Sequence, residues 1–378
     1  MQTEFAIRCN REDLLSGIQA ADGVVPTSSP KPILTNLQLE AKDGRLEVIA
    51  TDLQVGLRSI ISQVDVQKPG QAVVQARQLA AILKESRSHD VSMVLVRKED
   101  QSLLAITLND GDYQIPAVIG EAFPPVGFFP LDAPTVTING ARLEEMIRQT
   151  IFAVDKDRTS AVLSGLHLAI NEGEIILAAT DGKILCEAVD KGDYAYPEPL
   201  GIIIPAVTIN HLNRILLTTR AEATQIAIAG KLIFFRVLPS IGGPQVELTS
   251  RLVEGNFPPY RNALPPSAGS KASFHSAELA SGVRRTALMT SNTSRGIILT
   301  LGVDQAVLSN LNYTNGSARI PLQCTYQGQA IRLGVNAQYL SEVLKVYKGP
   351  HIDMEIGRSL IMREPGVTYL IMPISLPN

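Results

Sequence analysis

Two Thr-Asp pairs are the strongest candidates for catalytic or metal chemistry in this chain. Thr51-Asp52 and Thr180-Asp181 each follow a stretch with strand character, and carboxylates at strand ends can hold a metal ion or act as general acid and base. The alternative is structural, because Asp and Thr at such places commonly accept hydrogen bonds from nearby backbone N–H groups and fix a turn. The structural interpretation is the stronger one, since nothing else gathers around these pairs and a later, similar segment carries Leu311-Asn312 instead.

Other catalytic motifs are missing from the sequence. Gly230-Lys231 lacks the earlier glycine and the hydroxyl residue of a phosphate-binding loop and is typical of a hairpin turn. The histidines are scattered with no partner at the spacing of metal ligands, so we expect no zinc site. These histidines are His89, His167, His211, His275 and His351. The sequence therefore predicts a protein that is not an enzyme and binds no cofactor, with an enzyme using Asp52 or Asp181 as a remote alternative.

The Thr-Asp pairs belong to a unit that occurs three times. The first copy runs from Leu34 to Asp52 and the second from Leu163 to Asp181, so matched positions lie 129 residues apart (163 − 34). A third, more diverged copy consists of Gly296, Ile297, Leu299, Leu301, Ala306 and Leu308, each 131 residues beyond its counterpart in the second (296 − 165). This period is the size of a whole domain rather than of a solenoid or propeller repeat. The sequence therefore predicts three similar domains in tandem.

Each third of the chain combines strand patterns with two short helical patterns. Alternating apolar residues around turns such as Asp43-Gly44 predict antiparallel meanders. The first helical pattern has an apolar stripe in each repeat: Leu14, Leu15 and Ile18 in the first, Leu143, Met146 and Ile147 in the second, and Leu279 and Val283 in the third. The stripe of the second helical pattern consists of Leu79, Ile82 and Leu83 in the first repeat, Leu212, Ile215 and Leu216 in the second, and Leu340, Val343 and Leu344 in the third. We expect an α+β fold in which two helices pack on one side of antiparallel sheet. Proline-rich stretches separate the copies and place the domains at 1–130, 131–267 and 268–378.

Composition bounds the class of protein. The net charge of −3 argues against a simple nonspecific DNA coat but leaves room for a local basic face. The longest apolar runs, such as 201–205 and 232–235, are far shorter than the ~20 residues of a membrane-spanning helix and read as buried strands. The N-terminus lacks the zones of a secretory signal, and the cysteines Cys9, Cys186 and Cys324 are odd in number and widely spaced. We expect a cytoplasmic protein with no membrane contact.

Four segments, in this order and spacing, carry a resemblance to a known family. They are Pro32-Ile33-Leu34-Thr35-Asn36, Thr180-Asp181-Gly182, Phe257-Pro258-Pro259-Tyr260-Arg261 and Met372-Pro373-Ile374. The sequence resembles the bacterial DNA sliding clamp, the beta subunit of DNA polymerase III, over its full length. The resemblance implies a noncatalytic processivity factor: a head-to-tail homodimer whose six similar domains form a ring around duplex DNA without reading its sequence. A chain of like domains with sheet edges at both ends can close a ring by pairing those edges.

The resemblance also implies a hydrophobic pocket between domains two and three that binds a short Gln-Leu-x-Leu-Phe type segment of partner proteins. The partners would be the DNA polymerase III alpha subunit, the ATP-driven clamp loader complex, other polymerases, and mismatch-repair proteins or ligase. The deep part of the pocket would consist of Leu163, Gly165, Thr180, Gly182, Lys183, Ile184, Leu185, Pro258, Ala263, Leu370 and Met372, and the outer groove of Asn336, Tyr339, Pro373 and Ile374. Read without the family, Leu163, Leu185 and Leu370 are most simply core residues.

Two further surfaces follow from the resemblance. The residues facing DNA would be Arg77, Lys84, Arg148, Arg214, Arg284, Arg285 and Lys345, which lie opposite the apolar stripes of the predicted helices, although an ordinary solvated face has the same pattern. The dimer contact would join Tyr113 and Ile115 of domain one to Leu288 and Met289 of domain three, with a place in the core as the alternative for Ile115.

The sequence departs from the family pattern at several of these positions. Lys183-Ile184 stands where many relatives have His-Arg, and Ser375 replaces a basic residue. Ser28, Ala206, Val207 and Asn262 occupy places where relatives often carry basic residues. These differences leave open an alternative function, a specialised clamp-like scaffold that serves repair or an accessory polymerase.

Overall fold

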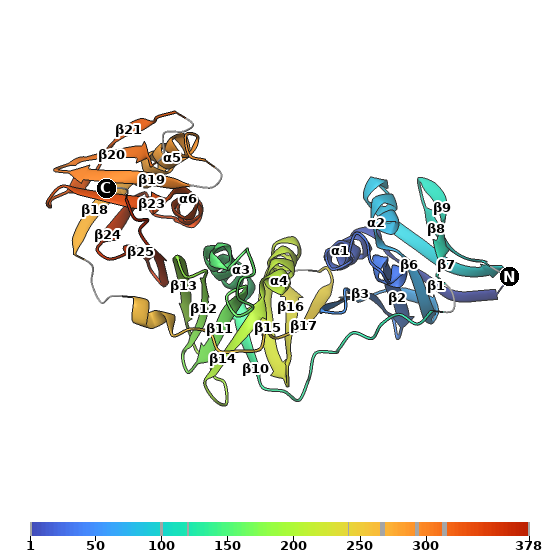
Figure 1. The fold of residues 1–378 in the computed structure, drawn as a ribbon. Helices are drawn as coiled ribbons and strands as arrows, with labels where there is room; N and C mark the ends of the chain where they lie inside the picture. The colour runs from blue at the N-terminus through green and yellow to red at the C-terminus, as the bar shows by residue number, and fades with distance from the viewer. Residues whose placement is uncertain are drawn as a thin grey trace. The chain divides into compact units, whose positions relative to one another are not determined.

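The structure is a computed structural model that describes residues 2–98, 101–118, 121–240, 242–264, 269–291, 295–311 and 316–376 (Figure 1). Asn312 and the predicted boundary at residue 267 lie outside these ranges. The chain divides into two compact units. Unit one comprises Met1–Glu144, Ala195–Pro197 and Val207–Leu252, and unit two comprises Glu145–Tyr194, Glu198–Ala206 and Val253–Asn378. The division passes through the middle third of the sequence, so the units do not follow the three repeats.

Unit one contains one antiparallel sheet of 13 strands. In spatial order these are β10 (Thr135–Asn139), β15 (Ala221–Ala229), β16 (Leu232–Pro239), β17 (Gln245–Arg251), β4 (Val55–Ile61), β3 (Arg45–Thr51), β2 (Asn36–Lys42), β6 (Gly70–Gln75), β9 (Gly111–Ala117), β8 (Gln101–Leu108), β7 (Asp90–Lys98), β1 (Gln2–Asn10) and β5 (Asp65–Lys68). The join between the first and second repeats is the ladder of β17 with β4, which runs from Gln245↔Ile60 to Ser250↔Val55. The sheet is therefore continuous across a boundary between repeats.

Unit two contains a nine-stranded and a four-stranded antiparallel sheet. The larger one has the order β14 (Leu200–Pro205), β11 (Gly165–Asn171), β12 (Glu174–Thr180), β13 (Ile184–Lys191), β26 (Val367–Ile371), β25 (Leu360–Glu364), β24 (His351–Ile356), β18 (Ser270–His275) and β22 (Thr325–Tyr326). The smaller one has the order β21 (Arg319–Gln323), β20 (Gln305–Asn310), β19 (Gly296–Gly302) and β23 (Ile331–Asn336). Here the second and third repeats join through the ladder of β13 with β26, from Ile184↔Ile371 to Ala188↔Val367.

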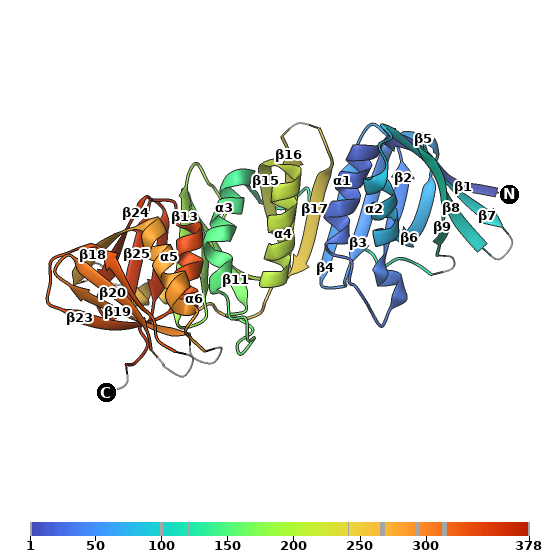
Figure 2. The same ribbon diagram turned by 90° about the horizontal axis from the view of Figure 1, so that it is seen from above.

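The predicted helical stripes all form helices. The helices are α1 (Arg11–Asp22), α2 (Ala76–Glu85), α3 (Gly140–Thr150), α4 (Ala206–Thr219), α5 (Ser276–Ala287) and α6 (Ala337–Val346). Leu14 and Ile18 of α1 and Leu79 of α2 have no exposed surface, because they pack on the sheet below. In unit one α1 contacts α2 and lies on β3 and β4, and in unit two α5 contacts α6 (Figures 1 and 2). The predicted α+β class with helices on one side of antiparallel sheet is confirmed.

The repeated sequence unit corresponds to the same hairpin three times: β2–β3, β11–β12 and β19–β20. The turns hold left-handed residues, with φ of 51° at Asp43, 72° at Gly44, 77° at Gly173 and 51° at Asp304. Positive φ values match the turn to the right-handed twist of the flanking strands, which explains the glycine in the first two copies. The triplication inferred from the sequence is confirmed, and the more diverged third copy uses Asp304 in place of glycine.

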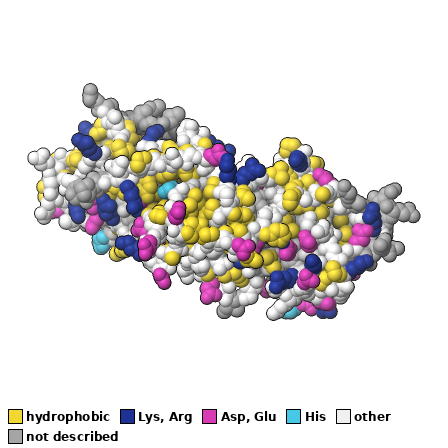
Figure 3. Space-filling model, turned by 90° about the horizontal axis from the view of Figure 1, so that it is seen from below, with side chains coloured by type: hydrophobic (Ala, Val, Ile, Leu, Met, Phe, Trp, Pro, Cys, Tyr) yellow, Lys and Arg dark blue, Asp and Glu magenta, His cyan; other side chains and the backbone are white. Residues whose placement is uncertain are grey.

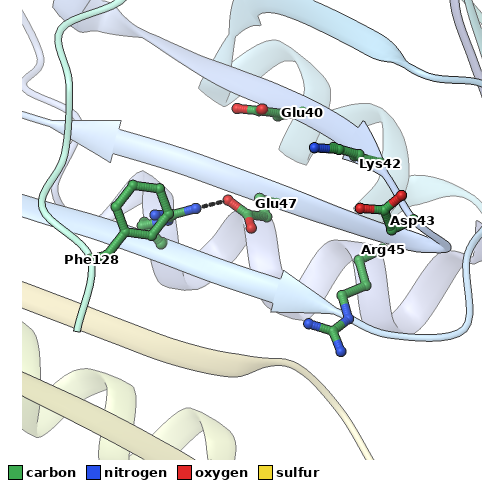
Figure 4. Close-up of a pocket in the computed structure, with 7 residues that line it drawn as sticks. Glu40, Lys42, Asp43, Arg45, Glu47 and Phe128 are labelled. Carbon is green, nitrogen blue, oxygen red and sulfur yellow. Dashed lines mark hydrogen bonds and ion pairs between the residues drawn. The ribbon is translucent and has the colours of Figure 1, made fainter. Parts of the chain in front are cut away.

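The segment after β9 forms a strap across the sheet of unit one. Phe128 lies over the guanidinium of Arg58, with 3.5 Å between Cζ and the ring centroid, and Arg58 forms an ion pair with Glu47 (Figure 4). Phe129 lies in the same way over Arg236, at 4.1 Å. Arg58 belongs to β4 of the first repeat and Arg236 to β16 of the second, so adjacent phenylalanines hold both sides of the β17–β4 join by cation–π contacts.

The cysteines are buried free thiols. Burial raises the pKa of Cys9 to about 12, and burial also raises the pKa of Cys186 and of Cys324. Thiols with such pKa values remain protonated near neutral pH and are poor nucleophiles. Across the described ranges, no helix is long and apolar enough to cross a membrane.

Candidate functional site

The Thr180-Asp181 pair closes the turn between β12 and β13. Thr180 Oγ1 donates a hydrogen bond to Ile184 O (2.7 Å) and accepts one from Gly182 N (3.0 Å). Asp181 Oδ1 accepts hydrogen bonds from the backbone N–H groups of Lys183 (2.8 Å) and Ile184 (2.9 Å). The carboxylate therefore fixes its own turn, as the structural interpretation predicted.

A pocket of about 200 Å³ opens beside this turn in unit two. Its lining consists of Thr180, Gly182, Lys183, Ile184, Leu185, Pro258, Tyr260, Ala263, Leu370 and Met372. The floor is formed by Ile184, Leu185 and Leu370, which are almost fully buried, and Leu185 and Leu370 cluster with Ile361. Met372 at the rim is 43% exposed. An apolar floor with an exposed rim is suited to receive the apolar side chains of a short peptide.

The end of the chain forms one wall of the pocket. Met372 N donates to Lys183 O (2.8 Å), and Ile374 N donates to Gly334 O of β23 (2.8 Å). A Cβ on Gly334 would lie 2.5 Å from Ile374 O, so only glycine permits this approach. The residues predicted for the outer groove thus continue directly from the pocket, with Pro373 and Ile374 following Met372 along the chain.

Tyr339, another predicted groove residue, connects the groove to the turn. Its hydroxyl donates a hydrogen bond of 2.6 Å to Asp181 Oδ2. Burial and this carboxylate raise the pKa of Tyr339 above its ordinary value. Tyr339 is held at the first turn of α6, where Asn336 Oδ1 accepts from Gln338 N (2.9 Å) and Tyr339 N (3.4 Å) as the N-cap. The third repeat therefore supplies a hydrogen bond to a turn of the second.

The linker between the second and third repeats forms the opposite wall. Tyr260 Oη (2.6 Å) and Arg261 Nε (2.8 Å) both donate to the buried carboxylate of Glu187 on β13. Burial and Glu187 raise the pKa of Tyr260, so its hydroxyl remains a donor. Phe257 stacks on His167 of β11 with ring centroids 4.8 Å apart, and burial lowers the pKa of this histidine. These contacts set the position of Pro258 and Tyr260 at the pocket.

Comparison with known proteins decides the family. Models for the N-terminal, central and C-terminal domains of the DNA polymerase III beta subunit match residues 5–126, 137–259 and 261–375. The chain belongs to this family. The beta sliding clamp of Treponema pallidum (strain Nichols) is 27% identical over 380 residues, covering 97% of this chain and 99% of the relative. A sliding clamp crystal structure from Pseudomonas aeruginosa, bound to griselimycin, superimposes with a TM-score of 0.87 at 26% identity, covering 99% of this chain and 100% of that one.

A beta subunit from Thermotoga maritima shares the fold, with a TM-score of 0.88 at 20% identity, covering 99% of this chain and 100% of that one. Because the family models cover most of its length, the chain is a DNA sliding clamp, a processivity factor of replication and not an enzyme.

Two residues predicted for the deep part of this clamp's pocket, Leu163 and Gly165, are not among the residues that line the cavity, and neither are the outer-groove residues Asn336, Tyr339, Pro373 and Ile374. Gly165 begins β11, where a Cβ would lie 2.5 Å from Ile203 Cγ2 of β14, so this glycine permits close packing of neighbouring strands. Leu163 is half-buried and its carbonyl accepts from Asp155 N (2.8 Å). Conversely, Tyr260 and its partner Glu187 were not singled out as site residues. The signal was present, because Tyr260 belongs to the Phe257–Arg261 segment that carried the resemblance.

The basic residues predicted to face DNA in this clamp differ in their surroundings. Arg77, Lys84, Arg284 and Arg285 are exposed, whereas Arg148 is half-buried. Lys345 forms an ion pair of 3.0 Å with Glu342. Arg214 Nη2 donates to the carbonyls of Gln19 (2.8 Å) and Ala20 (3.4 Å) in the last turn of α1. Figure 3 shows one face of the molecule, where Lys and Arg side chains alternate with Asp and Glu rather than forming one basic patch.

The residues predicted for the dimer contact fall into two groups. Tyr113 is 40% exposed and Leu288 is 76% exposed, so both side chains are accessible for a contact with another chain. Ile115 is 1% exposed and belongs to the core of unit one, as its alternative interpretation allowed, and Met289 is half-buried. Their role in dimer formation stays a prediction.

The histidines are less scattered in space than in the sequence. His275 and His351 lie opposite each other on β18 and β24, with ring centroids 5.5 Å apart. The sequence could not reveal this pair, because 76 residues separate its members (351 − 275). Over the part of the chain that the structure describes, no group of three or more His, Cys, Asp or Glu residues could hold a metal ion.

Proposed function

We propose that the pocket at Thr180–Ile184 is the docking site through which this clamp tethers its partners. The observation that carries the proposal is the apolar floor of Ile184, Leu185 and Leu370 beneath the exposed rim residue Met372. A flexible partner segment gains affinity by burying a few apolar anchors in a pocket of this kind. The segment is of the Gln-Leu-x-Leu-Phe type, and the partners are the DNA polymerase III alpha subunit, the clamp loader complex, other polymerases, and mismatch-repair proteins or ligase.

We further propose that two chains close head to tail around duplex DNA in the cytoplasm. Two sheet edges support this closure. β9 pairs with β8 along its length, but within the described residues its other side pairs only at Ala117↔Val74. β21 is the end strand of its sheet. The partly open edge of β9 in the first repeat can be covered by the edge of β21 from a second copy, with Tyr113 and Leu288 beside the new contact.

The contact with DNA is expected to be weak and directed at phosphates. The net charge of −3 gives no strong overall attraction to DNA, and on the face in Figure 3 the acidic and basic side chains are mixed. Arg77 and Lys84 on α2 and Arg284 and Arg285 on α5 are exposed and supply local positive charge. Loose contacts of this type allow sliding, because retention depends on encirclement rather than on affinity.

Fluorescence anisotropy of a labelled Gln-Leu-x-Leu-Phe type peptide tests the docking site. We expect saturable binding to the native clamp and a loss of at least tenfold in affinity for the Met372→Ala, Pro373→Ala double variant. Leu131→Ala is the matched control, since Leu131 is an apolar residue that is 80% exposed and lies far from Met372 in the sequence. Equal binding to the native protein and the double variant would refute the assignment of the pocket.

One observation favours a second candidate, a specialised scaffold for repair or an accessory polymerase. Lys183 and Ile184 both line the pocket, and they stand where the resemblance led us to expect His-Arg. Such a change would alter which partner peptides bind best. Competition between peptides from the replicative polymerase and from repair proteins distinguishes the two roles: a preference for the repair peptides by tenfold or more favours the scaffold, and the reverse ranking favours replication.

A further inference from the structure

A second groove lies in unit one at the place that the internal repeat makes equivalent to the peptide pocket. Its volume is about 320 Å³. Its lining consists of Thr51, Leu53, Gln54, Val55, Gly56, Pro124, Pro125, Val126, Gly127, Leu232, Thr249, Ser250 and Arg251. The 129-residue period relates Thr51 to Thr180, and the linker prolines Pro124 and Pro258 flank the two cavities in the same way.

The turns beside the two cavities have the same hydrogen bonds. Thr51 Oγ1 donates to Val55 O (2.8 Å) and accepts from Leu53 N (2.9 Å). Asp52 Oδ1 accepts from the backbone N–H groups of Gln54 (2.8 Å) and Val55 (2.7 Å). Each bond matches one made by Thr180 or Asp181. The strand ladders also correspond, because Val55 pairs with Ser250 as Ile184 pairs with Ile371. The equivalence is therefore structural as well as sequential.

The rim of the second groove contains a leucine in an unfavourable backbone conformation. Leu53 has a φ of 75°, and its counterpart in the second repeat is Gly182, with a φ of 86°. Glycine adopts this conformation readily, whereas a side chain such as leucine does so only with strain. The side chain of Leu53 is nevertheless 48% exposed. The turn requires a positive φ at this position, so a leucine here in place of glycine places an apolar side chain at the rim of the groove at the cost of backbone strain, which points to a function.

The other wall carries a charge that the peptide pocket lacks. The strand ladders place Arg251 of the second groove at the position that Met372 has in the peptide pocket. Arg251 is exposed, and its guanidinium makes no hydrogen bond or ion pair with any residue of the described ranges. The hydroxyls nearby are already committed, since Thr249 Oγ1 donates to Gly127 O (3.4 Å) and Ser250 Oγ bonds to Thr208 Oγ1 (2.7 Å). Within the described part of the chain, the groove thus presents apolar surface and the unpaired guanidinium of Arg251.

The depth of the groove also differs from that of the peptide pocket. Gly56 replaces the floor leucine Leu185, and Val126 of the linker occupies the space, so that a Cβ on Gly56 would lie 2.6 Å from Val126 Cγ1. A ligand here rests on Val126 and Leu53 rather than inserting a large side chain into a deep hole. The site suits a shallow contact with one apolar anchor beside a carboxylate.

We propose that the groove at Leu53, Val126 and Arg251 is a second docking site, which binds a short partner segment carrying an acidic residue next to an apolar one. Leu53 and Val126 contact the apolar side chain, and Arg251 pairs with the carboxylate. The charge distinguishes its ligands from those of the pocket at Met372. One chain can then hold two different partner segments at once, one in each unit.

Methyl NMR with labelled Leu, Val and Ile tests this site directly. The probe is the peptide Gln-Leu-Asp-Leu-Phe, and the control is Gln-Leu-Lys-Leu-Phe. We expect saturable shifts of the Leu53 and Val126 methyl signals with the acidic peptide, at an affinity at least fivefold higher than with the lysine peptide. The Arg251→Glu variant should prefer the lysine peptide. The substitution itself should leave the methyl signals of Leu370 where they are in the native protein.

The outcomes separate this proposal from the peptide pocket. Shifts of the Leu370 and Ile184 methyls with unmoved Leu53 and Val126 up to millimolar peptide would overturn the second site and leave the first intact. Shifts of Leu53 that persist equally in Arg251→Glu would also overturn it, because the charge would then play no part. If the peptide shifted the Leu53 methyl signals but not those of Leu370, the second site would be supported and the pocket at Met372 would be contradicted.

Discussion

Asp52 and Asp181 hold equivalent turns, but among the described residues only Asp181 has a further side-chain partner, the hydroxyl of Tyr339 at 2.6 Å. We expect Asp181→Ala to lower the free energy of unfolding by about 1 kcal/mol more than Asp52→Ala, because it also leaves the half-buried hydroxyl of Tyr339 without an acceptor. Urea unfolding of both variants measures the difference. In the double variant with Tyr339→Phe the excess should disappear; if it remained, the hydrogen bond would not be its source.

His167 gives the stability of the clamp a dependence on pH. Burial lowers the pKa of His167 in the folded state. When the pH falls below the ordinary histidine pKa of about 6.5, the unfolded chain therefore binds more protons than the folded one. The contribution is therefore present above pH 6.5 and lost as the pH falls below it. We expect the urea midpoint to decrease between pH 7 and pH 5 more steeply in the native protein than in His167→Phe, which keeps a ring against Phe257. Parallel decreases would show that His211, whose pKa burial also lowers, dominates.

At this scale the sequence predicted the chemistry of the turns well and their connections poorly. Asp and Thr at the end of a strand indicated a turn, and the turn formed. Nothing local indicated that Tyr339 would reach Asp181, because 158 residues separate the two. The contact between Tyr260 and Glu187 was not predicted either, because these residues are also far apart in the sequence. Hydrogen bonds between distant residues depend on the packing of whole elements, which periodicity does not encode.

Among the elements, the strap of Phe128 and Phe129 offers a matched pair of substitutions. Phe129 is 5% exposed and packs with Phe234, so Phe129→Ala should cost about 3–4 kcal/mol of stability through lost burial. Phe128 is 70% exposed, so Phe128→Ala should cost only the cation–π contact with Arg58, about 0.5–1 kcal/mol. Thermal unfolding of the two variants checks the order. Similar losses would mean that the strap acts mainly through its backbone.

Arg214 of α4 has a structural task that its predicted role does not include. Its guanidinium bonds to two carbonyls in the last turn of α1, as a basic C-cap supplied by the next repeat. We expect Arg214→Gln to destabilise the protein by about 1 kcal/mol, whereas Arg77→Gln on the exposed face of α2 should change stability by less than about 0.5 kcal/mol. Calorimetry separates the two, and equal stability of both variants would contradict the capping role.

The elements themselves were the most predictable part of the fold. The three hairpins and six helices follow from periodic apolar residues and from turn residues such as Asp43-Gly44. The ladders of β17 with β4 and of β13 with β26 were not predicted, although they join the repeats. A strand pattern shows that a strand has partners but does not identify them, and buried edges from different repeats look alike in sequence.

For the whole molecule, the proposed ring depends on an exposed apolar residue in the last third of the chain. We expect Leu288→Asp to convert dimers to monomers, because a charge would be desolvated at the contact. Leu288 is 76% exposed, so the substitution leaves the core intact. Leu131→Asp is the control, at a residue that is 80% exposed in the strap segment. Sedimentation velocity measures both, and a dimer that persists in Leu288→Asp would remove this residue from the interface.

The continuity of the sheets has a consequence for how such a chain could arise by duplication and be taken apart. A fragment of residues 131–267 would expose β17 without β4 and β13 without β26, two long strands with unsatisfied backbone groups. Produced alone, such a fragment would stack with its own copies into filaments. A single repeat on its own would leave the same edges open and could cover them only by pairing with other copies. In this chain the covalent order of the three repeats fixes which edge pairs with which.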